Sequence, residues 1–238
     1  MKKLLVSGLV LSAMSASAFA EDKKAWEATA ELGGTMTTGN TDTSTLKAKV
    51  DVIHNLENWK NNYYFDTLYS KDDDEKTASR WAIGAKGSYI LNEKSSLFVL
   101  AEYEQDEFSG YDSVGSLAAG YSRNFYKTET VTFDGDIGPG VKFFDNEDGS
   151  SEEVGIVHLG LVYKNELSKT STFTQILTSD VAFEDDSSTL SRSETSITAN
   201  IMNSLAMKLG FIVRHDSNPI DEKKSVDTET TITLLYKF

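Results

Sequence analysis

The chain has 238 residues, with 37 acidic residues against 23 basic ones and a formal net charge of −14. It contains no cysteine, which excludes a disulfide framework and a thiolate metal site. The acidic excess argues against nucleic acid as a partner, because binding to a phosphate backbone draws on clustered lysine and arginine.

The first twenty residues have the parts of a secretory signal peptide. Lys2 and Lys3 precede an apolar stretch at residues 4–14, and a small-residue cleavage site ends at Ala20. The apolar stretch is shorter than the roughly 20 residues that a membrane helix requires, and no later segment approaches that length. The sequence therefore predicts a signal peptide at residues 1–20, export of one domain at residues 21–238, and no helical membrane protein.

Apolar and polar residues alternate along the rest of the chain in about twelve segments separated by turn-forming residues. Clear examples, in chain order, are 46–52, 81–89, 131–137 and 205–213. This period of two marks a strand with one apolar and one polar face. Three segments are less regular: 113–126 has many small residues, 173–184 places Gln175 and Ser179 on the apolar face, and 154–163 is apolar on both faces except for His158.

The last segment, at residues 226–238, has the clearest alternation and ends the chain on an aromatic residue. Leu234, Tyr236 and Phe238 share its apolar face, whereas Lys237 lies on the other. This pattern resembles the C-terminal insertion signal of bacterial outer-membrane β-barrels. We therefore interpret Leu234, Tyr236 and Phe238 as an assembly signal.

Two sets of connections alternate along the chain. One set consists of short turns, and the other set includes several longer and more highly charged connections. The longer ones are predicted at residues 71–78, 146–152 and 218–225, where carboxylates outnumber lysines. Barrels of the outer membrane have short periplasmic turns and longer extracellular loops. The sequence thus predicts acidic extracellular loops and places both chain termini in the periplasm.

A sheet exposed to hydrocarbon must close on itself, because each unpaired N–H or C=O group would cost several kcal/mol. We therefore predict an all-β fold, a closed antiparallel transmembrane β-barrel of about twelve strands. The polar phase of the strands would line its lumen. The lumen-lining candidates are Lys47, Lys49, Asp51, Arg80, Lys86, Glu102, Glu104, Asp134, Asp136, Lys208, Arg214 and Glu229. Such mixed charge either plugs a lumen or lines a narrow water-filled path.

Candidate catalytic and metal sites are weak. His54 and His158 have no predicted partner, and His215 and Asp216, as neighbours on a strand, point to opposite faces. The acidic run at residues 145–149 has its glycine one place early for an EF-hand loop and lacks the glutamate at the twelfth position. We predict no catalytic residue, no metal site and no cofactor.

Several short motifs, in order and spacing, are similar to the YdiY-like family of salt-induced outer-membrane proteins. The motifs are Gly33-Gly34, Thr38-Gly39-Asn40-Thr41, Leu46-Lys47-Ala48, Phe108-Ser109-Gly110-Tyr111-Asp112 and Tyr236-Lys237-Phe238. The resemblance implies an outer-membrane barrel with a link to salt or osmotic conditions, and it supplies no catalytic residues.

Three hypotheses for function follow. The first is a non-enzymatic, monomeric barrel of the bacterial outer membrane, either a narrow porin-like channel for small solutes or ions or an envelope-integrity protein linked to salt stress. The second is a barrel enzyme that hydrolyses lipid or peptide, and the third is a soluble periplasmic β-protein that binds a ligand. The first implies contact with the lipid bilayer and lipopolysaccharide, and with the export and barrel-assembly machinery.

Overall fold

A computed structural model describes residues 24–37, 43–146, 148–184, 186–220 and 223–238. The predicted signal peptide and its cleavage at Ala20 lie outside these residues. Twelve strands make up the described part of the chain. They are β1 (Trp26–Thr37), β2 (Thr43–Asn55), β3 (Trp59–Asp72), β4 (Glu75–Asn92), β5 (Ser95–Asp106), β6 (Tyr111–Lys127), β7 (Val131–Asn146), β8 (Ser151–Glu166), β9 (Ser171–Ala182), β10 (Leu190–Asn200), β11 (Leu205–Asp216) and β12 (Val226–Lys237).

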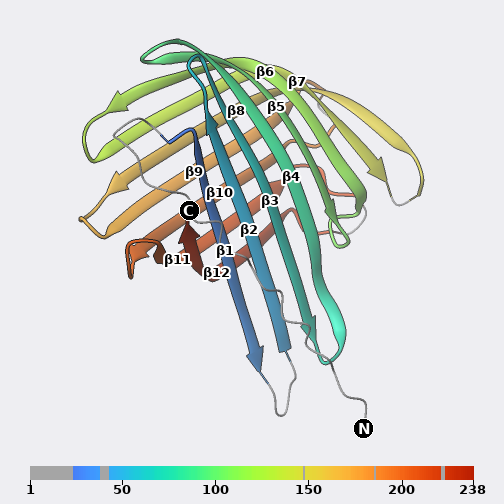
Figure 1. Cartoon of the computed structure of the whole chain (residues 1–238). Coiled ribbons are helices and arrows are strands. Elements are labelled where there is room, and N and C mark those ends of the chain that lie inside the picture. Colours follow the sequence, from blue (N-terminus) through green and yellow to red (C-terminus); the bar gives the residue numbers. More distant parts are fainter. Residues whose placement is uncertain (1–23, 38–42, 147, 185, 221–222) are drawn as a thin grey trace.

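The strands form one closed barrel in which each strand pairs antiparallel with its neighbours in the chain (Figure 1). Closure comes from β1 and β12, which pair over four residues from Thr29 to Leu32. The predicted closed barrel of about twelve strands is confirmed. Among the described residues no helix is long and apolar enough to cross a membrane.

The two ends of the barrel differ. We call the end that carries Trp26 and Lys237 the turn end, and the opposite end, with the connections at residues 107–110 and 217–225, the loop end. The described start of the chain lies beside its C-terminus, since Lys24 Nζ donates a hydrogen bond to the Phe238 carbonyl at 3.5 Å. The start of the described residues and the C-terminus therefore share the turn end, and its periplasmic placement stays a prediction.

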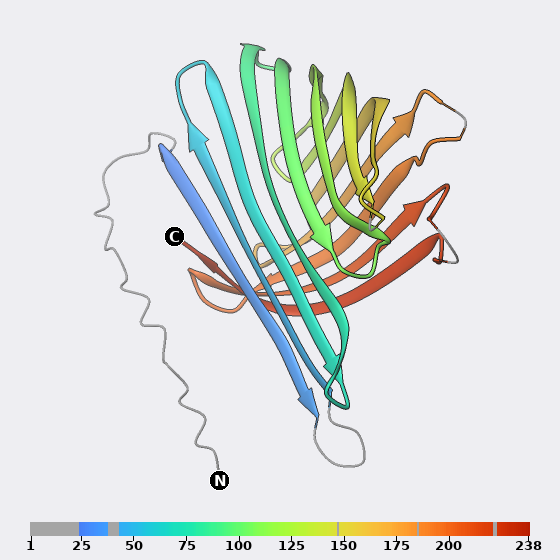
Figure 2. The same cartoon turned by 90° about the vertical axis from the view of Figure 1, so that its right-hand side faces the viewer.

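The connection between β3 and β4 differs from the predicted loop at residues 71–78. Strand β3 continues to Asp72 and β4 begins at Glu75, so the turn consists of Asp73 and Asp74 alone. Both have positive φ, 46° and 64°, as a tight hairpin turn requires. The hairpins β1–β2 and β3–β4 reach farthest at the loop end (Figure 2).

The outer face of the barrel is apolar. Ile232, Leu32 and Val99 are 65%, 61% and 58% exposed, and they alternate with inward-facing neighbours. In β9 the polar residue Gln175 shares this outer face with Leu177, as the pattern predicts, and it donates a hydrogen bond to Ser193 on β10 at 3.0 Å. The apolar phase of the sequence thus forms the outside of the barrel.

Seven of the buried apolar residues form two clusters inside the barrel. Phe98, Leu100 and Ala118 form one of them, on β5 and β6. The other cluster lies nearer the loop end and consists of Tyr111, Phe144, Val154 and Ile156. These clusters inside the lumen therefore take the role that a hydrophobic core has in a soluble domain. Charged side chains occupy the space between the two clusters.

Candidate functional site

A network of ion pairs crosses the barrel interior, and its first part centres on Arg80 and Glu229. Arg80 contacts Asp66 at 2.7 Å and Glu229 at 3.5 Å, while Lys47 contacts Asp66 at 3.5 Å and also pairs with Glu229. Arg214 binds Glu229 at 3.1 Å. Because β1 separates β2 from β12, Lys47 and Glu229 can meet only inside the barrel.

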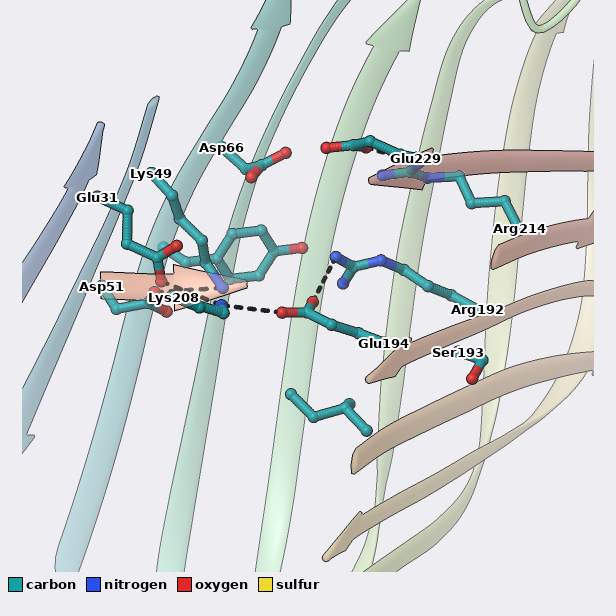
Figure 3. Close-up of polar contacts among 12 residues, drawn as sticks. Glu31, Lys49, Asp51, Asp66, Arg192, Ser193, Glu194, Lys208, Arg214 and Glu229 are labelled. Atoms are coloured by element: carbon teal, nitrogen blue, oxygen red, sulfur yellow. Dashed lines mark hydrogen bonds and ion pairs between the residues drawn. The ribbon is translucent and has the colours of Figure 1, made fainter. Parts of the chain in front are cut away.

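The second part of the network centres on Lys208 of β11 (Figure 3). Its ammonium group lies 3.1 Å from Glu31 of β1 and 3.0 Å from Glu194 of β10. Glu194 also accepts a bond from Arg192 at 2.7 Å, and Thr233 donates to Glu31 at 3.2 Å. Each carboxylate here has two partners, so the network holds strands on both sides of the β1–β12 seam.

A third group of charges lies on the wall formed by β4 and β7–β9. Lys86 pairs with Asp136 of β7 and lies 4.8 Å from the centre of the Phe98 ring. The partner that sequence reasoning did not find for His158 is Asp180, the residue opposite it in the β8–β9 ladder, at 2.7 Å. Lys142 pairs with the same carboxylate at 2.5 Å.

These pairs resist opening because most of their members are buried. Glu31, Lys47, Asp66, Arg80 and Glu194 are each less than 8% exposed. Removing one partner of such a pair typically costs about 3–5 kcal/mol, because the remaining charge is left buried and unpaired. Charged groups that hold one another, together with the apolar cluster around Phe98, therefore fill part of the interior.

Beside this network the barrel contains a cavity of about 620 Å³. Its lining extends from Phe108 and Lys223 in loops at the loop end to Lys49 and Tyr64 farther inside. None of its lining residues belongs to a connection at the turn end. The cavity is therefore a vestibule that faces the loop end, with the ion-paired network alongside it.

Tyr64 is one of the vestibule residues that the sequence did not predict. It lies between Tyr63 and Phe65 on β3, and its hydroxyl donates a hydrogen bond to Glu102 of β5 at 2.7 Å. Tyr64 precedes Asp66 by two residues, so the alternation places both side chains on the same face of β3. This spacing is the signal that could have identified Tyr64 as a lumen residue. The three consecutive aromatic residues obscure this signal.

The other predicted site residues occupy separate places. Lys49 pairs with Asp51 at 3.2 Å, and Glu104 lies 3.4 Å from Arg80. Asp134 accepts a hydrogen bond from the amide of Asn124 at 2.7 Å, near the turn end. The interior charges are therefore divided among several groups and do not converge on one reactive centre.

The proposed assembly residues lie on the outer face at the closing seam. Leu234 and Tyr236 are opposite Leu32 and Ala30 of β1. Phe238 donates its backbone N–H to the Ala28 carbonyl at 2.9 Å, and its ring centre is 4.8 Å from that of Tyr236. Their role in assembly stays a prediction.

Among the described residues, His215 and Asp216 do not hydrogen-bond each other, and His54 has an aromatic neighbour. His54 stacks on Trp26, with ring centres 3.7 Å apart. His215 is exposed on β11, whereas Asp216 accepts hydrogen bonds from Ser188 and Tyr111. In the described part of the acidic run at 145–149, hydrogen bonds from Ser150 lower the pKa of Asp148. No group of three or more potential metal ligands occurs among the described residues.

The comparisons with known proteins agree with the barrel. The chain is 26% identical over 218 residues to the uncharacterized protein YdiY of Escherichia coli (strain K12), which covers 91% of this chain and 85% of that protein. Its fold is similar to the translocator domain of the autotransporter NalP from Neisseria meningitidis (TM-score 0.54, 12% identity, 92% of this chain and 90% of that one). It is also similar to an outer-membrane channel from Pseudomonas putida F1 (TM-score 0.55, 9% identity, 95% and 100%). A family described as "Protein of unknown function, DUF481" matches residues 30–238, and the chain belongs to this family.

Proposed function

We propose that the protein lies in the bacterial outer membrane and acts there as a narrow, non-enzymatic channel for ions or small solutes. The observation that carries the proposal is the vestibule of about 620 Å³, which faces the loop end beside the network of ion pairs. The similar fold of the channel from Pseudomonas putida F1 supports it. The partners that this proposal implies are the bilayer with its lipopolysaccharide and the export and assembly machinery.

Charged side chains inside a barrel give a path for hydrated ions when they leave space between them, and they set the sign of the ion that passes. Asp66 lies both on the vestibule wall and in the ion-paired network. When the charge of Asp66 is removed, its two partners Arg80 and Lys47 each retain an ion pair with Glu229. A neutral residue at position 66 therefore changes the charge of the path while leaving both cations paired.

The packed interior favours a second candidate, a closed barrel that maintains the envelope under salt or osmotic stress. Phe98 is 2% exposed and Ile212 is likewise 2% exposed, although both face the lumen. Side chains so buried leave little room for a continuous water path. In this case the network would act as an internal brace between strands.

Single-channel conductance of the refolded mature protein in a planar bilayer separates the two candidates. We expect discrete conductance steps, and we expect Asp66→Asn to shift the permeability ratio toward chloride because it removes a negative charge from the path. The control is Glu107→Gln, which breaks an exposed ion pair with Lys76 at 2.6 Å outside the lumen and should leave selectivity unchanged. Silence from a protein that shows the gel mobility of a folded barrel would favour the closed barrel.

A further inference from the structure

Two arginines face each other across the ladder between β10 and β11. Arg192 is directly opposite Arg214 in the register of these strands, and both extend in the same direction into the interior (Figure 3). Like charges at directly opposite positions destabilise a sheet. Each guanidinium is held by a single carboxylate, Arg192 by Glu194 at 2.7 Å and Arg214 by Glu229 at 3.1 Å.

Both guanidinium groups also have unused donors. Arg192 Nε and Arg214 Nη2 are buried and have no hydrogen-bond partner among the described residues. They are two of only four such side-chain atoms in the described part of the chain, so the unpaired donors are concentrated at this pair. A buried donor without a partner costs about 1–3 kcal/mol, and more when it is charged. Because both arginines line the vestibule, a solute that enters from the loop end can approach the two guanidinium groups, whereas the unpaired Nε and Nη2 atoms themselves are shielded from solvent.

We propose that Arg192 and Arg214 form a binding site for the oxyanion of a small soluble solute, a carboxylate or phosphate group that enters the vestibule from the loop end. Such a group would neutralise the repulsion between the arginines and accept hydrogen bonds from their guanidinium groups. The planar guanidinium fork suits oxyanions better than the ammonium of lysine does. Three of the four arginines of the chain, Arg80, Arg192 and Arg214, line this vestibule, together with four lysines.

The opposite wall restricts the ligand further. Strand β5 lies halfway round the closed barrel from β11, and its residues Glu102 and Glu104 line the same vestibule. A second anionic group on the solute would face these carboxylates. The site therefore fits a solute with one oxyanion and a remainder that donates hydrogen bonds or carries positive charge. Its place inside the barrel excludes the acyl chains of a lipid.

The test is titration calorimetry of the refolded mature barrel in non-ionic detergent at low ionic strength, with inorganic phosphate as the probe. We expect Arg192→Gln and Arg214→Gln each to weaken phosphate binding about tenfold or more, and the double variant to abolish it. Both variants should fold, because each carboxylate retains another ion pair. Glu194 still pairs with Lys208, and Glu229 still pairs with Lys47 and Arg80. The control is Arg123→Gln, which removes an exposed arginine of β6.

Three results would overturn the proposal: phosphate binding that the double variant retains, no phosphate heat from the folded wild type, or equal weakening by Arg123→Gln. Micelles containing phosphatidylglycerol test whether the oxyanion comes from a lipid headgroup. If arginine-dependent binding occurred only with these micelles, the proposal of a soluble solute would be wrong. Arg192→Lys with Arg214→Lys should bind phosphate with intermediate affinity, because charge remains and the fork is lost. The assay requires no conductance, so a silent barrel that binds phosphate would refute the channel and leave this site standing.

Discussion

Tyr64 and Gly84 face each other in the ladder between β3 and β4, and the ring of Tyr64 occupies the space that a side chain at position 84 would need. A Cβ atom at Gly84 would overlap the Tyr64 ring, whose hydroxyl donates to Glu102 at 2.7 Å. The glycine thus lets an aromatic side chain lie flat against the vestibule wall, and this contact positions one of the acidic groups of that wall.

We predict that Gly84→Ala destabilises the barrel by about 1–3 kcal/mol, the usual cost of overpacking a well-packed site. The displaced ring would also lose its hydrogen bond to Glu102. Urea unfolding followed by tryptophan fluorescence measures the change. Gly115→Ala is the matched control, because the nearest atom to its added methyl group is 3.8 Å away, an ordinary contact. Equal unfolding midpoints for the two variants would contradict the prediction.

At the scale of the strands, the weakest part of the closed sheet is the seam between β1 and β12. Four residue pairs join these strands, whereas β2 and β3 pair over thirteen residues from Thr43 to Asn55. Phe238 adds one more backbone bond to this seam, its N–H to the Ala28 carbonyl at 2.9 Å. The end of the chain therefore contributes to closure, whether or not it is also recognised during assembly.

Deletion of Phe238 should lower the amount of protein in the membrane severalfold, because it removes the last backbone bond of the seam and the end of the proposed assembly signal. Immunoblotting of the detergent-extracted membrane fraction measures this amount. Leu167→Ala, at an apolar residue of similar exposure in a turn of the same end (56% against 53%), serves as the control. If both variants reach the membrane at the wild-type level, the assembly role of Phe238 is wrong.

The strands could be predicted from the sequence because successive side chains in a strand point to opposite faces, so one apolar surface leaves a period of two. The prediction was wrong at residues 71–78, where charge was interpreted as a loop. There β3 and β4 continue beyond the region where one face is apolar, so the alternation ends although the ladder does not. Charge alone cannot distinguish a loop from a strand whose two faces are both exposed to solvent.

The interior partners could not be predicted in the same way. The alternation assigns Lys86 and Asp136 to one phase, but β4 and β7 are three strands apart in the order of the barrel. Their contact depends on the register of every ladder between them and on the diameter of the closed sheet. Sequence therefore indicates which charges share a phase, and the closed geometry determines which of them meet.

The outer face of the whole barrel is apolar, which distinguishes a membrane barrel from the soluble periplasmic protein considered as an alternative. Leu32, Val99 and Ile232 are more than half exposed on different strands, and aqueous monomers rarely expose apolar surface around their whole circumference. In a bilayer this surface faces hydrocarbon, and the cost of placing a charge on it depends on depth.

This dependence makes Ile232→Lys a test of the environment. Ile232 is 65% exposed near the middle of β12, so in water a lysine there would change stability little. In lipid vesicles we expect it to cost about 2–4 kcal/mol, because the ammonium group would lie near the bilayer midplane. Val226→Lys, on the same face at the end of the same strand, should cost about 0–1 kcal/mol near the interface. Unfolding in vesicles gives both values, and two equally small costs would indicate that this face is not in contact with lipid.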